Sequence, residues 1–154
     1  MGELVIPSEE NIEALRYQGE FRNGLQDGDG VCKYPNGDLY TGRWKEGMRS
    51  GKGTLVLMSL AEEDGSGRGS EASGSSHSKQ PRTYVGDWQE NVRHGVGKYE
   101  DVGWVYEGEW KADKREGKGV LTLKSGRKFD GDWGNDRLNG LIKVCQTGFY
   151  ITER

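Results

Sequence analysis

The sequence predicts an all-β protein, an elongated single-layer antiparallel sheet of consecutive β-hairpins preceded by a short, partly helical N-terminal segment. An aromatic–x–Gly–x–aromatic motif recurs five times, mostly about 23 residues apart, which is typical of stacked repeats. Only 32% of the residues are hydrophobic and 26 of 154 are glycine, which argues against a thick core. The five Trp, seven Tyr and three Phe lie almost entirely in the repeats, so each repeat can bury aromatic surface in one layer.

Each copy of the motif has the side-chain spacing of a β-strand. In the copy that runs from Tyr40 to Trp44, the two rings and Gly42 are two residues apart, so they share one face of a strand. Residues 51–57 alternate in the same way and predict the second strand of a hairpin. The other copies are Tyr17–Phe21, Tyr84–Trp88, Tyr106–Trp110 and Phe129–Trp133.

The glycine inside each motif needs a physical reason, because glycine weakens the interior of a strand. We expect a neighbouring Tyr or Trp ring to lie across the gap that Gly42 leaves on the aromatic face. The glycine pair that follows, Gly51 and Gly53 in this copy, is predicted to mark the return of the hairpin loop into the second strand. Three residues after each second ring stand only residue types that tolerate positive φ. This predicts a left-handed backbone at Gly24, Gly47, Asn91, Asp113 and Asp136.

Short turns are predicted between successive repeats. Asn36-Gly37 is a strong signal for a two-residue hairpin turn, and Ser125-Gly126 is similar. The hairpins are therefore expected to follow one another as a meander of about ten antiparallel strands in one twisted sheet.

The recurring pattern Y-x-G-x-W-x-x-G-x-x-x-G-x-G resembles the MORN repeat (membrane occupation and recognition nexus). The resemblance covers residues 17–58 and 84–145, and the copy that starts at Phe129 fits only in part. It implies a single-layer array of hairpins with a scaffold role at cytoskeletal, ciliary or membrane-associated structures, and in some members self-association. The copies that fit closely start at Tyr17, Tyr40, Tyr84 and Tyr106.

Five segments are expected along the chain. Residues 1–16 form an N-terminal cap segment, in which Ser8 can cap a short helix that covers the edge of the first hairpin. Residues 17–58 form repeats one and two, and residues 84–128 form repeats three and four. Residues 129–154 form a partial fifth repeat and a closing strand pair.

The segment between the second and third repeats, residues 59–83, is a Ser/Gly-rich insertion. It is predicted to be disordered, because from Glu62 onward it holds no aliphatic residue larger than Ala and cannot bury enough surface to offset its ordering entropy. Its seven serines leave two interpretations open. The segment is either an idle surface loop or a loop that phosphorylation or a partner regulates.

Composition and motifs argue against catalysis and against nucleic-acid binding. A net charge of −3 gives no electrostatic argument for nucleic acid. His77 and His94 have no Cys or carboxylate at a zinc-ligand spacing, so no metal site is predicted. Residues 47–54 resemble a phosphate-binding loop only superficially, because the glycine spacing is one residue short. We therefore expect a protein that is not an enzyme and needs no cofactor.

The sequence also predicts a cytoplasmic location. Cys32 and Cys145 are too few for a secreted disulfide framework, which favours a reducing compartment. The first residues lack the basic and apolar regions of a signal peptide, and no apolar run reaches the roughly 18 residues of a membrane-spanning helix. The resemblance adds the cytoskeleton, the cilium or a membrane surface as the place of action.

Binding is expected on the ring-bearing face, because a one-layer sheet has no second layer to cover its apolar side. The predicted partner is a protein, and an amphipathic helix is a natural occupant of an aromatic groove. The predicted protein-binding residues are Tyr40, Trp44, Tyr84, Trp88, Tyr106, Trp110, Phe129 and Trp133.

An alternative function is a membrane tether that binds phosphoinositides or other anionic lipids through basic residues near two hairpin turns. Self-association as a homodimer, through the strand edge of the last unit at residues 129–150, is compatible with either function. The predicted lipid-binding residues are Arg43, Lys45, Arg49, Lys52, Lys111, Lys114, Arg115 and Lys118.

Overall fold

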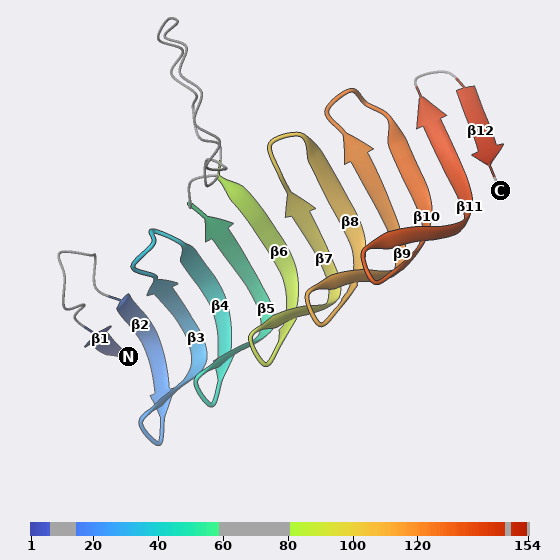
Figure 1. The fold of residues 1–154 in the computed structure, drawn as a ribbon. Coiled ribbons are helices and arrows are strands. Elements are labelled where there is room, and N and C mark those ends of the chain that lie inside the picture. Colours follow the sequence, from blue (N-terminus) through green and yellow to red (C-terminus); the bar gives the residue numbers. More distant parts are fainter. Residues whose placement is uncertain (7–14, 59–80, 147–148, 154) are drawn as a thin grey trace, which may run out of the picture.

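The computed structural model describes residues 1–6, 15–58, 81–146 and 149–153, the last twelve of them (140–146 and 149–153) by their backbone only. These residues form one sheet of twelve strands whose spatial order is the order of the chain, and each strand pairs antiparallel with its neighbours (Figure 1). The strands are β1 (Gly2–Ile6), β2 (Leu15–Arg22), β3 (Leu25–Lys33), β4 (Leu39–Lys45), β5 (Met48–Leu57), β6 (Arg82–Gln89), β7 (Val92–Glu100), β8 (Trp104–Lys111), β9 (Lys114–Leu123), β10 (Lys128–Gly134), β11 (Arg137–Gln146) and β12 (Phe149–Glu153).

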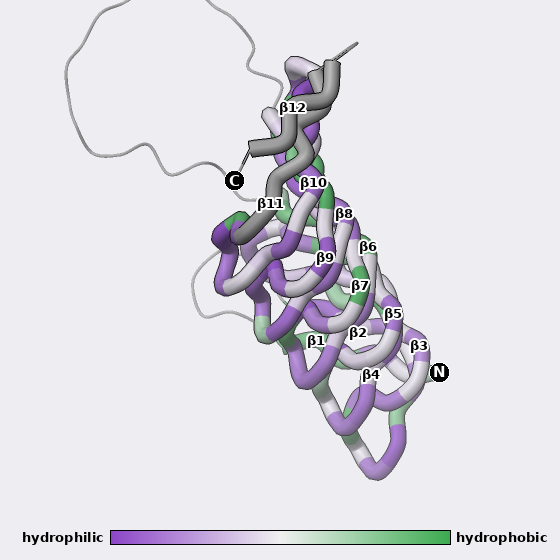
Figure 2. Tube along the Cα trace, turned by 90° about the vertical axis from the view of Figure 1, so that its right-hand side faces the viewer, coloured by the Kyte–Doolittle hydropathy of each residue, from purple (hydrophilic) through white to green (hydrophobic). Residues whose placement is uncertain are grey.

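The sheet is a single layer, as predicted. Each strand hydrogen-bonds only to its neighbours in the sheet, and the described residues contain no helix and no second sheet. Figure 2 looks along the row of strands and shows the hairpins stacked one behind another, with hydrophilic residues at most positions. The core of this fold is therefore a strip of side chains on one face of the sheet.

The turn inside each repeat has only two residues. In the second repeat these are Glu46 and Gly47, with φ of 50° and 80°, the pattern of a type I′ hairpin turn. The predicted left-handed backbone is confirmed in all five copies, at Gly24, Gly47, Asn91, Asp113 and Asp136. The prediction that the following glycine pair marks the return of the hairpin loop into the second strand was wrong. Gly51 lies inside β5, opposite Trp88 of the next repeat, with φ of 70°, and the register shifts nearby.

The turns between repeats are longer than the predicted two residues. The Gly37 N–H donates to the Tyr34 carbonyl at 2.9 Å, which places Pro35 and Asn36 at the centre of a four-residue turn. Gly37 follows with φ of 87°. Proline at the second turn position favours this geometry because its φ is already fixed.

The structure agrees only in part with the predicted segments and their boundaries. The first edge is covered, but by the strand β1, which pairs with β2 from Gly2↔Gly19 to Ile6↔Leu15. Most of the predicted helix, and the predicted disorder from residue 59 to 80, lie outside the described residues. Strand β6 begins at Arg82, two residues before the predicted start of the third repeat, because Arg82 and Thr83 pair with the end of β5.

Candidate protein-binding face

One face of the sheet carries a continuous row of large side chains, which we call the aromatic face. Each member of the row lies directly opposite the next on the neighbouring strand. The row comes from the period-two alternation of the strands, which places every motif ring on the same side. From β2 to β10 its members are Tyr17, Cys32, Tyr40, Leu55, Tyr84, Tyr99, Tyr106, Leu121 and Phe129.

The motif rings pack edge to face in an unbroken chain. Within the second repeat the ring centroids of Tyr40 and Trp44 lie 5.2 Å apart at 89°. Tyr40 also contacts Trp88 of the third repeat at 5.4 Å, so the chain of rings continues across the insertion. The same two contacts recur along the array from Phe21 to Trp133. Such pairs contribute about 0.5–1.5 kcal/mol each beyond their buried area.

Each motif tyrosine lies over the glycines of its own hairpin. A Cβ placed on Gly53 would lie 2.6 Å from the Tyr40 ring, so only glycine leaves room for the ring. The Tyr40 hydroxyl donates to the Arg43 carbonyl at 3.0 Å, and the other three motif tyrosines make the equivalent bond. A Cβ on the motif glycine Gly42 would lie 2.7 Å from the Tyr40 hydroxyl and, closer still, 2.5 Å from the Gly53 Cα. The predicted role of the motif glycine is therefore confirmed only in part, because the tyrosine ring lies mainly over the second glycine, on the paired strand.

The tryptophans join each repeat to the one before it. The Trp88, Trp110 and Trp133 indole N–H groups donate to the Gly53, Gly97 and Gly119 carbonyls at 3.0–3.2 Å. Trp44 differs, because its Nε1 is buried and has no hydrogen-bond partner among the described residues.

Seven of the eight predicted protein-binding residues are buried, and only Phe129 is half-buried. The rings are thus the core of the array, and little of their surface is open to a partner. The open part of the aromatic face comes from half-buried side chains around the rings. These are Tyr34, Leu55, Leu57, Trp104, Leu121 and Leu123.

A row of arginines lies on the tryptophans. Two of them, Arg49 and Arg115, were predicted as lipid-binding residues, but their stacking on rings was not predicted. The Arg93 guanidinium carbon lies 4.3 Å from the Trp110 ring centroid, and that of Arg115 lies 4.4 Å from the Trp133 ring centroid. Each of these arginines also donates a hydrogen bond to the carboxylate of the aspartate that has a positive φ in the next repeat, Asp113 or Asp136. A sequence signal exists, because arginine stands five residues after the second ring at Arg49, Arg93 and Arg115, and four residues after it at Arg137.

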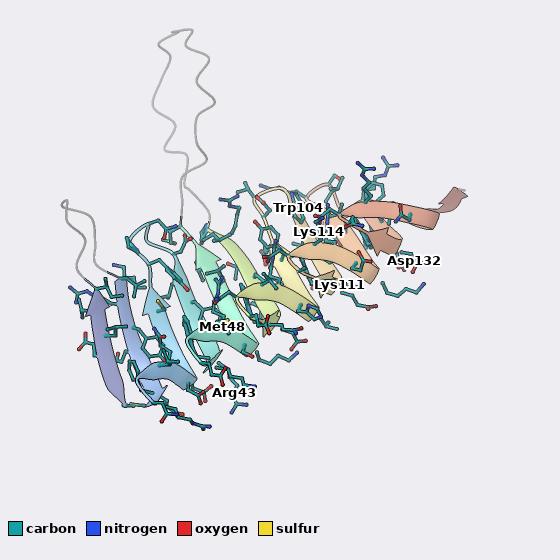
Figure 3. All side chains as sticks on the ribbon, turned by 60° about the horizontal axis from the view of Figure 1, so that its bottom comes forward. Arg43, Met48, Trp104, Lys111, Lys114 and Asp132 are labelled. Atoms are coloured by element: carbon teal, nitrogen blue, oxygen red, sulfur yellow. The ribbon has the colours of Figure 1, made fainter. Side chains whose placement is uncertain are left out.

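The predicted lipid-binding residues do not form one basic surface. Arg43, Lys52 and Lys118 are paired with the carboxylates of Asp29, Asp87 and Asp132, and Arg115 is paired with Asp136. Arg49 and Arg115 stack on rings of the aromatic face. Figure 3 shows that Arg43 lies well apart from Lys111 and Lys114 along the sheet.

Burial of the tyrosines on the aromatic face leads to a prediction about alkaline pH. Desolvation raises the pKa of Tyr34 and of Tyr106 to about 12, and raises the pKa values of Tyr40 and Tyr84 as well. The unfolded chain releases these protons near pH 10 while the folded chain keeps them, so unfolding becomes easier above that pH.

The urea concentration at the midpoint of unfolding should therefore stay constant near neutral pH and fall as the pH rises from about 10 to 12. A titration of the midpoint with parallel phenolate absorbance checks this prediction. Tyr106→Phe should make the fall shallower, because one raised pKa is removed. A midpoint that stays constant through this range would contradict the assignment.

The described residues contain no group of three or more His, Cys, Asp and Glu side chains placed to hold a metal ion. Nor does this part of the chain have a helix that is long and apolar enough to cross a membrane.

The repeat geometry agrees with a match to a known family. A family model described as "MORN repeat" matches residues 17–39, 40–57, 84–103 and 106–126, together more than half of the chain. This chain belongs to the MORN repeat family. The match ends before the fifth copy of the motif, so the four copies that fit the MORN pattern closely are the four that match. The MORN repeat family is in general non-catalytic.

Curated proteins with similar sequences also contain MORN repeats. Alsin from Homo sapiens and from Rattus norvegicus is 34% identical over 131 residues, which cover 76% of this chain and 8% of alsin. "MORN repeat-containing protein 3" from Xenopus laevis is 34% identical over 68 residues, which cover 37% of this chain and 27% of that protein. This MORN array therefore spans only a small part of the length of these relatives.

Proposed function

We propose that this MORN array is a non-enzymatic scaffold or adaptor that binds a protein partner on its aromatic face. The observation that carries the proposal is the construction of that face. A rigid chain of buried rings supports half-buried apolar side chains and stacked arginines, and no described residue covers them. Large apolar patches that stay open on a soluble domain are typical of interaction surfaces.

The occupant we favour is an amphipathic helix. Half-buried leucines such as Leu55 and Leu121 offer apolar contacts, and the polar groups of Arg93 and Arg115 lie beside them on the same face. A helix with one apolar stripe can contact both kinds of side chain at once. The place of action, at the cytoskeleton, the cilium or a membrane, stays a prediction from the family resemblance.

The lipid tether remains the second candidate, and its support is weaker. Four of the eight basic residues are engaged by carboxylates, which reduces their attraction for an anionic surface. Lys45 and Lys111 are exposed and make no ion pair with a described residue, but they lie on different hairpins. Self-association of the last unit also stays a prediction, and β12 is the last strand that the described residues add to the sheet at that end.

A site-specific photo-crosslinker tests the proposed face. Placed at Leu57 on the aromatic face, it should give discrete crosslinked products in a native cell extract, because a bound partner covers that side chain. Placed at Val85, which is 50% exposed on the opposite face, it should give none of these products. Equal labelling from both positions, or no product from Leu57, would contradict the proposal. Both variants should melt close to the parent chain, since neither site belongs to the buried rings.

A further inference from the structure

The three described arginines that stack on tryptophans are not equivalent in charge. The Nε groups of Arg93 and Arg115 donate to the carboxylates of Asp113 and Asp136 at 2.9 and 3.1 Å. Beside Arg49 the residue equivalent to these aspartates is Asn91, whose side chain is an uncharged amide. The amide oxygen accepts the Arg49 backbone N–H at 2.9 Å, and the Asn91 carbonyl accepts from Nη2 at 2.7 Å.

Arg49 therefore has a positive charge that no carboxylate among the described residues compensates, whereas the charges of Arg93 and Arg115 are compensated by aspartates. Its Nε is buried without a hydrogen-bond partner, and no carboxylate among the described residues forms an ion pair with it. Its guanidinium lies 4.4 Å from the centroid of the Trp88 ring, which fixes its position on the aromatic face. A partly buried, held guanidinium is a strong recognition element for a carboxylate.

A hollow of about 480 Å³ lies beside Arg49, lined also by Tyr34, Pro35, Leu55 and Leu57 among others. The equivalent place beside Arg115 is filled, because Trp104 stacks there against Tyr99, with centroids 5.3 Å apart, and against the guanidinium.

The hollow exists because two smaller residues replace these rings. Cys32 lies opposite Tyr40 in the register as Tyr99 lies opposite Tyr106, and Asp38 stands two residues before Tyr40 as Trp104 stands before Tyr106. Sequence variation between repeats thus opens the aromatic face at one place, next to the one arginine without a carboxylate among the three.

The carboxylate of Asp38 also borders the hollow, and it is already engaged. Asp38 is 8% exposed, and its two oxygens accept hydrogen bonds from the Asn36 side chain and from the Met58 backbone N–H, both at 2.8 Å. It makes no ion pair with Arg49. The wall of the hollow therefore combines the Arg49 guanidinium with leucine side chains and with Tyr34, Pro35 and Asn36 of the turn between repeats.

We propose that this hollow is the specificity-determining pocket of the aromatic face, and that it takes a protein segment presenting an acidic side chain next to an apolar one. The carboxylate pairs with Arg49, and the apolar side chain packs on Leu55 and Leu57. This inference rests on the proposed function, because it assumes that a protein segment docks on the aromatic face. Charge complementarity selects the occupant, since a segment without an acid leaves the Arg49 charge desolvated and unpaired.

The test uses a display library of helical peptides with randomised surface positions, selected against the full chain. The selected peptides should carry Asp or Glu within one helical turn of Leu, Ile or Phe. A labelled peptide from this selection should then bind Asn91→Asp about tenfold more weakly, because the new carboxylate neutralises Arg49 as Asp136 neutralises Arg115. Arg49→Gln should weaken binding to a similar extent. Asp136→Asn is the matched control, and it should change the affinity by less than about twofold, because Trp104 fills the equivalent hollow there.

Folding is checked in the same variants. Asn91→Asp should melt roughly 2–4 °C higher than the parent chain, because the Arg49 Nε gains a charge-assisted hydrogen bond, so weaker binding cannot come from unfolding. Peptides without acidic enrichment, or peptides that bind Asn91→Asp as tightly as the parent, would overturn the inference and leave the proposed function intact. A library that yields no peptide at all would count against the proposed function and, with it, this pocket.

Discussion

Replacing Trp88 by alanine is expected to cost about 4 kcal/mol of stability and to uncouple the two halves of the array. The Trp88 ring is 5% exposed and contacts Tyr84 at 5.1 Å, Tyr40 at 5.4 Å and the Arg49 guanidinium at 4.4 Å. It is the ring that carries the chain of edge-to-face contacts from Tyr40 on β4 to β6, across the insertion. In a repeat array stability is a sum of repeat and interface terms, so one weak interface separates its neighbours.

Urea denaturation followed by circular dichroism should therefore change from one transition to two. Hydrogen exchange should show that β1 to β5 and β6 to β12 open at different urea concentrations. Val96→Ala is the control, because Val96 is 60% exposed on the opposite face and its truncation should change stability by less than about 0.5 kcal/mol. A single transition for Trp88→Ala, shifted no more than that of the control, would show that the ring contacts do not couple the repeats.

A single methyl group at Gly108 should destabilise the protein by about 3 kcal/mol or more, lowering the melting temperature by roughly 10 °C. A Cβ at this position would lie 2.5 Å from the Gly119 Cα and 2.6 Å from both the Lys118 carbonyl oxygen and the Tyr106 hydroxyl. Two of these neighbours are backbone atoms of the paired strand, so the substitution has to push β8 and β9 apart. Thermal melts of Gly108→Ala measure the effect.

Gly103→Ala provides the matched comparison, because a Cβ there meets no atom within 4 Å and the backbone has no positive φ. It should melt within about 2 °C of the parent chain. Equal melting temperatures for the two variants would mean that the strands tolerate a side chain at Gly108, and the steric explanation of the motif glycine would fail.

Local features of the sequence were sufficient to predict much of this fold. The spacing of two between Tyr40, Gly42 and Trp44 places all three on one face regardless of what lies next to them. Positive φ at Asn91 and Asp113 follows from the short list of side chains that tolerate it. The turn around Gly37 was harder, because Pro35 fixed a longer turn than the Asn-Gly pair suggested.

The candidate site could be predicted only in part. The rings were placed on the correct face, but whether a ring is covered depends on its neighbours across the strands. Trp110 is buried because Tyr84, Tyr106 and the Arg93 guanidinium surround it. Arg93 bonds Asp113 of the next repeat, 20 residues away, and the recurrence of arginine after the second ring marks the position of Arg93 but does not indicate its partner.

The sequence alone determined the repeat, the strand period, the left-handed turn residues and the side of the sheet that carries the rings, because each of these depends on side chains a few residues apart. Only the tertiary structure decided which rings are core, which arginine lacks a carboxylate and where the aromatic face is hollow. The physical reason is that burial and charge compensation are properties of residues brought together by strand pairing. In this array each hairpin acquires them from the hairpins on either side of it.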